Sequence, residues 1–302
     1  MKVIVSKVFI ISMFLLLMLN LTVNAQDELM DLLGNEEPST EILTATFKTN
    51  RIVLGQSIEN PAEGVLMFLI QHHFGRVNSG SYEFFGLDQA TIRLGLEYGI
   101  TPKLAVGMGR SSYNKTFDGF VKYKILRQSK GPGSIPLSLS YFGSTALNSL
   151  KWADPERENY ASSRYQFTHQ LLIARQFSPA VSLQLTPTFI HKNLVATSED
   201  KNDILATGIG GRVKLTKRIT LNGEYFYVLP DQIVSRDYDN SFSLGFDIET
   251  GGHVFQLFFT NSNPIFDAGF ITETNGKWAD GDIYFGFNIS RVFTMVKPKG
   301  FR

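Results

Sequence analysis

The sequence predicts an all-β protein, an up-and-down antiparallel transmembrane β-barrel of about 12 strands. Apolar and polar residues alternate in strand-length segments, as at 181–186, 242–248 and 283–293, and successive side chains of a strand point to opposite faces. The connections between such segments switch between short and long, which is typical of outer-membrane barrels. After residue 25 no apolar run approaches the ~20 residues of a spanning helix. We therefore expect strands to cross the membrane, with short periplasmic turns and long extracellular loops.

The expected strands follow one another without another folded domain between them. They lie near residues 65–74, 89–98, 103–112, 116–127, 136–146, 164–177, 180–191, 204–216, 218–228, 240–249, 253–261 and 282–293. Tight turns fall near 99–102, 178–179, 217 and 251, whereas 147–163, 193–203, 229–239 and 262–281 are long loops. The chain then divides into a signal peptide (1–25), an N-terminal periplasmic or luminal segment (26–64), the barrel (65–293) and a C-terminal tail (294–302).

The first residues have the form of a secretory signal peptide. Lys2 and Lys7 precede the mostly apolar run 8–21, and small residues end at Ala25, where we expect cleavage. The mature protein would begin at Gln26 and reside in the outer membrane of a Gram-negative bacterium. The chain has no cysteine, which excludes disulfides, thiolate metal sites and a lipid anchor on a cysteine at the cleavage point.

The segment before the barrel allows two interpretations. Residues 47–58 have strand-like content, but a thirteenth strand would break the even number that such barrels favour. We therefore expect 47–58 to lie in or under the lumen. Residues 26–46 carry only acidic charges and are either ordered with that stretch or a flexible linker.

Charged residues on the polar faces of the strands are the candidate functional residues. Lys122 and Lys124 alternate on one strand, and Arg212 and Lys214 on another. The lumen-lining candidates for selectivity are Arg93, Glu97, Lys122, Lys124, Arg212, Lys214, Glu224 and Asp247. Cationic rings in a pore favour anions, so we predict a narrow channel for small polar or anionic solutes.

A closed barrel is the alternative function. Eight-stranded barrels are filled by side chains and sixteen-stranded ones are open, so about 12 strands allow either state. In the closed state the luminal bases would pair with Glu97, Glu224 and Asp247 in a structural network. The barrel would then serve structure, adhesion or partner docking through acidic surface loops. Small residues such as Ser182, and Gly208 on a neighbouring strand, leave space and favour the channel.

Catalysis, metals and cofactors have little support in the sequence. A lipid hydrolase would need a serine near a histidine, and Ser144 or Ser149 with His169 is the available combination. No motif surrounds these residues, so we expect no enzyme. His72 and His73 are adjacent on a strand and point to opposite faces, which argues against a shared metal ion. We expect no cofactor, and bases spread over many strands argue against nucleic-acid binding.

The expected partners are those of an outer-membrane barrel. Membrane lipid would surround the apolar face, and Arg175 and Arg291 would extend to the headgroups at the periplasmic end. Basic residues near the outer rim, Lys115, Arg164 and Lys192, would meet lipopolysaccharide phosphates. The outer-membrane assembly machinery would insert the chain.

Several segments resemble an uncharacterised β-barrel family of Bacteroidetes outer membranes, known as a domain of unknown function. They are residues 71–75, 85–88, 117–123 and 281–293, and the resemblance extends from about Phe47 to Phe293. It implies a Gram-negative envelope and one barrel domain, and it brings no activity, substrate or catalytic residue. This chain has His73 where the family pattern leads us to expect arginine.

Overall fold

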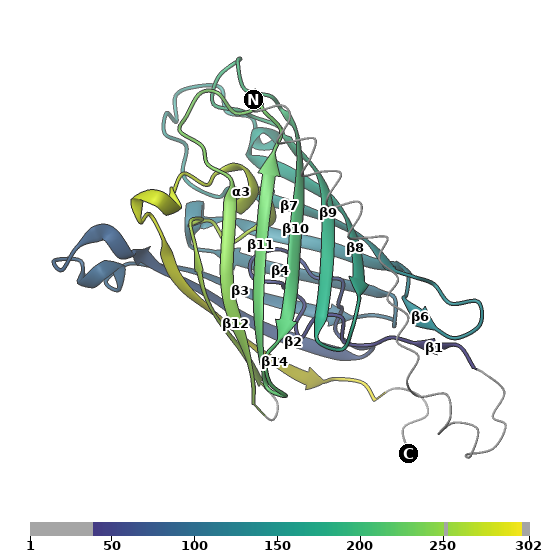
Figure 1. Cartoon of the computed structure of the whole chain (residues 1–302). Helices are drawn as coiled ribbons and strands as arrows, with labels where there is room; N and C mark the ends of the chain where they lie inside the picture. The colour runs from purple at the N-terminus through teal and green to yellow at the C-terminus, as the bar shows by residue number, and fades with distance from the viewer. Residues whose placement is uncertain (1–38, 251–252, 298–302) are drawn as a thin grey trace, which may run out of the picture. The chain divides into compact units, whose positions relative to one another are not determined.

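The structure, a computed structural model, describes residues 39–250 and 253–297. Twelve strands form a closed barrel in which each strand pairs antiparallel with the barrel strands before and after it (Figure 1). The strands are β2 (Val65–Arg76), β3 (Ala90–Gly99), β4 (Leu104–Ser111), β5 (Phe117–Leu126), β7 (Ser138–Leu147), β8 (Tyr165–Gln176), β9 (Val181–Lys192), β10 (Asp203–Lys214), β11 (Ile219–Val228), β12 (Ser241–Thr250), β13 (His253–Thr260) and β14 (Tyr284–Thr294). The pairing of β14 with β2 closes the barrel. The predicted fold is confirmed, and every predicted strand begins and ends within two residues of an observed one.

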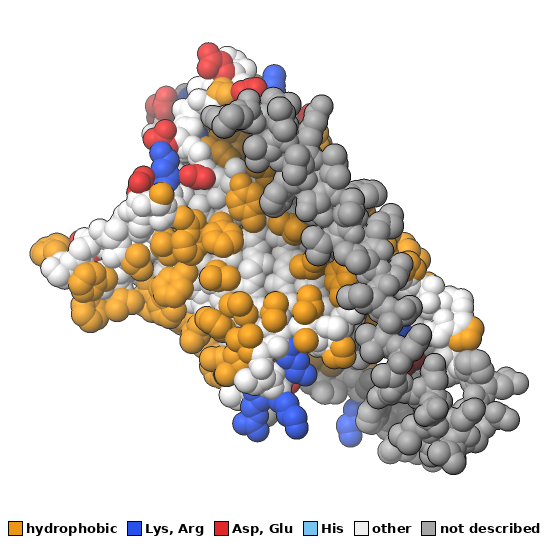
Figure 2. All heavy atoms as spheres, viewed as in Figure 1, with side chains coloured by type: hydrophobic (Ala, Val, Ile, Leu, Met, Phe, Trp, Pro, Cys, Tyr) orange, Lys and Arg blue, Asp and Glu red, His pale blue; other side chains and the backbone are white. Residues whose placement is uncertain are grey.

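The two faces of the barrel wall have opposite chemistry. On β9, Ser182 and Gln184 are buried toward the interior, whereas Leu183 and Leu185 are exposed on the outside. An apolar outer face and a polar inner face suit a wall that contacts lipid. Figure 2 shows the apolar side chains as a band across the visible face, with Lys and Arg gathered at one end and Asp and Glu at the other.

The connections define two ends of the barrel. One end, the turn end, carries the connections 100–103, 127–137, 177–180 and 215–218. The other, the loop end, carries 77–89, 112–116, 148–164, 193–202, 229–240 and 261–283. At the turn end, the short strands β1 (Glu41–Ile42) and β6 (Ser129–Lys130) form a separate two-stranded sheet.

Residues 46–58 form a tight hairpin inside the barrel, which we call the plug hairpin. Arg51 pairs with Gln56, the Ile52 N–H donates to the Gly55 carbonyl at 2.8 Å, and the Ser57 N–H donates to the Asn50 carbonyl at 2.9 Å. All of its residues except Lys48 are buried. The stretch 47–58, which we expected in or under the lumen, thus occupies the interior.

Part of the connection between β13 and β14 also enters the barrel. Its helix α3 (Asp267–Thr272) is buried at every residue, and the ring of Phe270 packs edge-on against Phe226 of β11 at 5.1 Å between centroids. The expectation that 262–281 lies wholly outside the barrel is therefore wrong. Its apolar residues leave water by packing against the plug hairpin and the inner wall. We call residues 261–275 the inward loop.

The expected signal peptide (1–25), residues 26–38 of the segment that follows it and the last residues of the tail (298–302) lie outside the described residues. Within the described residues, no helix combines the length and the apolar character that crossing a membrane requires.

Candidate functional site: the occupied lumen

Glu224 of β11 holds the tip of the plug hairpin. Its carboxylate accepts the backbone N–H groups of Val53 at 3.2 Å, Leu54 at 2.6 Å and Gly55 at 3.1 Å. Three consecutive N–H groups converging on one anion form a nest, a strong arrangement for a buried charge. A Cβ at Gly55 would lie 3.0 Å from the Phe226 ring, so glycine permits this close approach of the hairpin to the wall.

Arg51 links the plug hairpin to both the wall and the inward loop. One Nη atom lies 3.2 Å from the Glu97 carboxylate of β3, and the other lies 3.8 Å from that of Asp267 in α3. The Asn50 amide also donates to Glu97, at 2.8 Å. Arg51 and Glu97 are 4% and 1% exposed, so each charge has exchanged water for its partners.

The two lysines of β5 are also engaged by the N-terminal segment. Lys122 is completely buried, and its Nζ donates to the Gln56 side-chain oxygen at 3.3 Å and to the Ser57 carbonyl at 3.2 Å. Lys124, nearer the turn end, lies 3.7 Å from Glu59. Both lysines face the interior, but in this state their charges meet protein groups rather than an open water path.

Arg93 pairs within the wall itself. Its Nε donates to Asp118 of β5 at 2.8 Å, its Nη2 also contacts that carboxylate, and its Nη1 donates to Gln71 of β2 at 2.9 Å. A Cβ at Gly109 would lie 2.4 Å from the guanidinium, so that glycine makes room for the side chain. Asp118 was not among the predicted residues. Asp118 lies an even number of residues before Lys122 on the same strand, and this spacing would have placed it on the inner face.

The remaining candidates lie toward the turn end. Asp247 of β12 accepts from the Gln256 amide at 2.8 Å, and the same amide donates to the Ile52 carbonyl of the plug hairpin at 3.1 Å. Arg212 is buried, 5% exposed. Lys214 is exposed at the end of β10 and does not join the other candidates.

The structure thus brings together most of the predicted luminal residues, with partners that differ from those predicted. We considered that the luminal bases would pair with Glu97, Glu224 and Asp247. Instead, the plug hairpin binds Glu97, Glu224 and Lys122. Arg51 and Asp267 were missed, because a single arginine or aspartate outside the strands gives no sign of its position inside a barrel. A role of these residues in solute selectivity stays a prediction.

The histidine pair lies on two faces of β2. The His73 Nδ1 lies 3.1 Å from the Asn263 carbonyl of the inward loop, whereas His72 stacks on Phe287 at the outer face, 4.9 Å between centroids. Among the described residues, no cluster of three or more His, Cys, Asp or Glu side chains is placed to hold a metal ion.

The serine and histidine considered for hydrolysis are kept apart. Ser144 shares the interior-facing parity of Phe142 on β7, and its register partner is Thr168. His169 is therefore on the other face, where its Nδ1 lies 2.6 Å from the Tyr141 hydroxyl. The Ser149 hydroxyl donates to the Lys115 carbonyl. These contacts give neither serine a general base.

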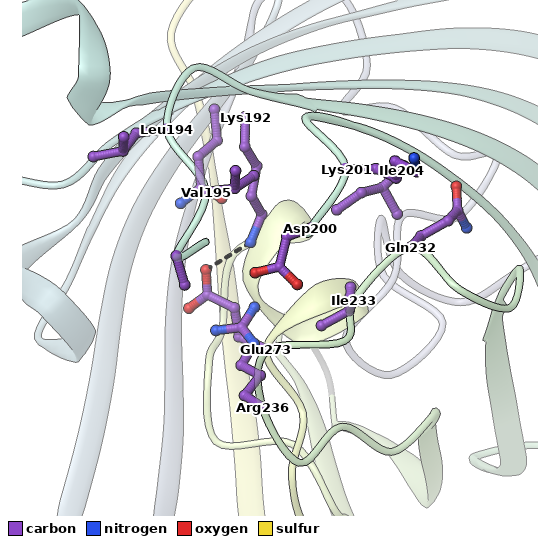
Figure 3. A pocket seen from close by; sticks show the side chains of 12 residues that line it. Lys192, Leu194, Val195, Asp200, Lys201, Ile204, Gln232, Ile233, Arg236 and Glu273 are labelled. Atoms are coloured by element: carbon purple, nitrogen blue, oxygen red, sulfur yellow. Dashed lines mark hydrogen bonds and ion pairs between the residues drawn. The ribbon is translucent and has the colours of Figure 1, made fainter. Parts of the chain in front are cut away.

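A cavity of about 130 Å³ lies at the loop end (Figure 3). We call it the mouth pocket, and it is lined by Gln166, Lys192, Leu194, Val195, Ala196, Asp200, Lys201, Ile204, Gln232, Ile233, Arg236 and Glu273. Lys192 was expected at the outer rim, but it is 6% exposed and its Nζ lies 3.1 Å from the Glu273 carboxylate. Three bases and two acids therefore surround this cavity.

Asp200 connects two of the loops around the mouth pocket. Its carboxylate accepts the Val234 N–H at 2.9 Å, the Ser235 N–H at 3.0 Å and the Ser235 hydroxyl. The Ser235 hydroxyl is the main cause that lowers the pKa of Asp200 to about 2, with further contributions from the backbone N–H groups. Asp200 thus stays ionised at neutral pH and holds the 229–240 loop beside 193–202.

Comparison with solved structures gives distant matches to porins and an outer membrane channel. The NanC porin matches at 8% identity and a TM-score of 0.47, over 75% of this chain and 98% of that chain. The KdgM porin matches at 9% and 0.44, over 75% and 98%, and an outer membrane channel from Pseudomonas putida F1 at 11% and 0.45, over 78% and 97%. Likenesses this distant identify no solute. No protein of curated function matches the sequence.

The sequence also matches a protein-family model. The sequence model of one family matches residues 47–293, which include almost all of the plug hairpin and of the barrel. The resemblance found in the sequence is thereby confirmed as to family, while an origin in Bacteroidetes stays a prediction. The chain belongs to the family described as "Membrane bound beta barrel domain (DUF5777)".

Proposed function

We propose that this protein is an outer-membrane channel for small polar or anionic solutes, closed in the described state by its own plug hairpin. The observation that carries the proposal is that one short segment binds several charged residues of the wall. Glu97, Glu224 and Lys122 all bind the plug hairpin. Withdrawal of that segment would return these charges to water and leave a polar passage.

A barrel that is always filled does not require charged residues on its inner wall. Replacement of buried ion pairs by apolar residues of similar volume is often neutral or stabilising. Charges such as Lys122 and Glu97, at 0% and 1% exposure, are therefore weak evidence for packing. They suit an interior that holds water during part of the functional cycle.

The path of the chain allows withdrawal without threading. Before the plug hairpin, the Leu43 N–H donates to the Gln128 carbonyl at 2.9 Å, and after it, the Gly64 N–H donates to the Gly99 carbonyl at 2.9 Å. Gln128 and Gly99 both lie at the turn end. The hairpin therefore enters and leaves the barrel at one end and can move out through that end.

The mouth pocket supports the solute class. Lys192, Lys201 and Arg236 outnumber Asp200 and Glu273 around it, so its field favours small anions over cations. With the loop end outside the cell, a solute would meet this cavity before the lumen. Insertion by the outer-membrane assembly machinery belongs to the same proposal, as does lipopolysaccharide contact at the loop-end base Arg164.

Conductance in planar bilayers tests the proposal. The unchanged protein should show rare openings, and deletion of residues 46–58 should produce steady ion flow. Deletion of the exposed loop residues 153–158 is the matched control and should leave the closed state unchanged. Heat-modifiable migration would verify that each variant folds as a barrel.

A closed structural barrel is the second candidate, and one observation favours it. Phe270 and Ile271 of α3 are completely buried, and the Phe270 ring packs against Phe226 of the wall, so the inward loop fills part of the interior without the plug hairpin. A folded variant that lacks 46–58 and remains electrically silent would favour this candidate. Silence after additional deletion of 266–273 would exclude the channel.

A further inference from the structure

The connection between β2 and β3 exposes an unusual amount of aromatic surface. Tyr82 is 92% exposed, Phe84 59%, Phe85 56% and Leu87 41%. Figure 1 shows this connection, residues 77–89, projecting sideways from the barrel wall, and Figure 2 shows apolar side chains gathered at its end. We call residues 77–89 the aromatic loop. A contiguous apolar patch that does not pack on the rest of the protein indicates a surface for contact with another molecule or with the membrane.

Hydrogen bonds at the start of the aromatic loop and within it hold it in this position. The Val77 N–H donates to the Ile283 carbonyl at 2.8 Å, and the Asn78 amide donates to the Asp282 carboxylate at 2.8 Å. Within the loop, the Phe85 N–H donates to the Gly80 carbonyl at 2.9 Å. The exposed aromatic rings are therefore presented by an anchored structure.

Close backbone contact at the base of the aromatic loop also holds the loop in position. Gly86 has a φ of 87° and packs on Gly75 of β2, where a Cβ on Gly86 would lie 2.5 Å from the backbone. Only glycine suits that position. The aromatic loop is thus built to leave the wall at a defined angle.

The aromatic loop continues the surface that faces lipid. On the outer wall at its base, Phe74 stacks on Phe285 at 5.6 Å between centroids, and Phe285 packs against Phe259 at 5.4 Å. These rings belong to β2, β14 and β13 near the loop end. Aromatic rings gather at the membrane interface, where an apolar body and a polar surrounding are both satisfied.

We propose that the aromatic loop lies in the outer interface of the membrane and inserts Phe84 and Phe85 between lipid chains. The occupant of this surface is the lipid bilayer, because the apolar patch is continuous with the wall that the bilayer already covers. The loop has no base between 77 and 89, so the contact is with acyl chains and the interface rather than with phosphate groups. The proposal does not depend on whether the barrel conducts.

The absence of cysteine from the chain permits a clean test by site-specific labelling. Phe85→Cys would carry an environment-sensitive fluorophore in vesicles of phosphatidylcholine. Asp237→Cys, in the exposed part of the 229–240 loop, is the matched control. We expect blue-shifted emission at 85, several-fold stronger quenching by nitroxides on the acyl chains than at 237, and several-fold weaker quenching by aqueous iodide.

A second label keeps the result decisive if loss of the Phe85 ring disturbs the loop. Tyr82→Cys retains both phenylalanines, and its label should also be quenched from the lipid phase. Iodide access at 82 and 85 equal to that at 237, in variants with heat-modifiable migration, would overturn the proposal. Protection that depends on protein concentration, without quenching by lipid nitroxides, would also overturn it and point to a second copy of the chain.

Discussion

Arg51 of the plug hairpin lies 3.8 Å from Asp267 of helix α3, and this contact joins the two segments that fill the barrel. Arg51 also contacts Glu97 of the wall at 3.2 Å. One guanidinium therefore holds together three parts of the chain that are far apart in the sequence. The closed state consequently depends on a small number of buried charges as well as on apolar packing.

Replacement of Arg51 by alanine should release the plug hairpin. In the closed state Glu97 and Asp267 would then be buried without their cation, and loss of one partner of a buried pair costs about 3–5 kcal/mol. We expect a higher open probability in planar bilayers and a lower free energy of unfolding in urea. Lys48→Ala removes the partially exposed pair with Glu249, and as the matched control it should cost about 0–1 kcal/mol. Equal conductance of the two variants would contradict the assigned role of Arg51.

A charge on the lipid face should be more damaging than one in an emptied lumen. Leu244→Arg should cost about 2–4 kcal/mol in a folding titration, because its side chain contacts the bilayer interior. Leu183 is a less informative position for this test, because its register partner is Arg175 near the turn end.

A charge introduced on the inner face should be tolerated in an emptied barrel but not in the filled one. Gln184 is 1% exposed and donates to the Gln56 carbonyl at 2.7 Å, so Gln184→Arg should destabilise the complete protein. Deletion of 46–58 should restore tolerance of this arginine, because the side chain then meets water. Equal destabilisation with and without the plug hairpin would show that the wall alone confines position 184.

Charge reversal on the inner wall should change ion selectivity once the plug hairpin is removed. Lys124→Glu, in a protein lacking 46–58, should shift the zero-current potential in a salt gradient toward cation preference. The shift should fade with salt, because the Debye length falls from ~10 Å at 0.1 M to ~3 Å at 1 M. Lys217→Glu in the turn 215–218 is the control. An unchanged potential in a conducting variant would place Lys124 away from the ion path.

The loops around the mouth pocket should respond to acid through Asp200. Its pKa is lowered to about 2, so its stabilising contribution is present above the ordinary carboxyl pKa and is lost as the pH falls through about 2. Asp200→Asn should speed amide hydrogen exchange at Val234 and Ser235 at neutral pH. The exposed Asp154→Asn serves for comparison. Unchanged exchange at both amides would mean that other contacts hold the loop.

The sequence by itself determined the barrel and the faces of its strands, because these depend on patterns that repeat over a few residues. The alternation at 181–186 places Gln184 inside and Leu183 outside without knowledge of any partner. The same parity placed Arg93, Lys122 and Glu224 on the inner wall. A register error of one residue would have reversed all of these positions, so the alternation carried a large part of the structure.

Only the tertiary structure decided what those inner residues meet. Glu224 binds the Leu54 N–H across 170 residues of chain, and Arg51 reaches an aspartate in a connection that the sequence placed outside the barrel. No local pattern encodes such contacts, since an inward-facing charge has the same spacing whether it faces water or a buried hairpin. The choice between an open and an occupied lumen was made by packing among distant segments, where burial of Phe270 and pairing of Arg51 are satisfied together.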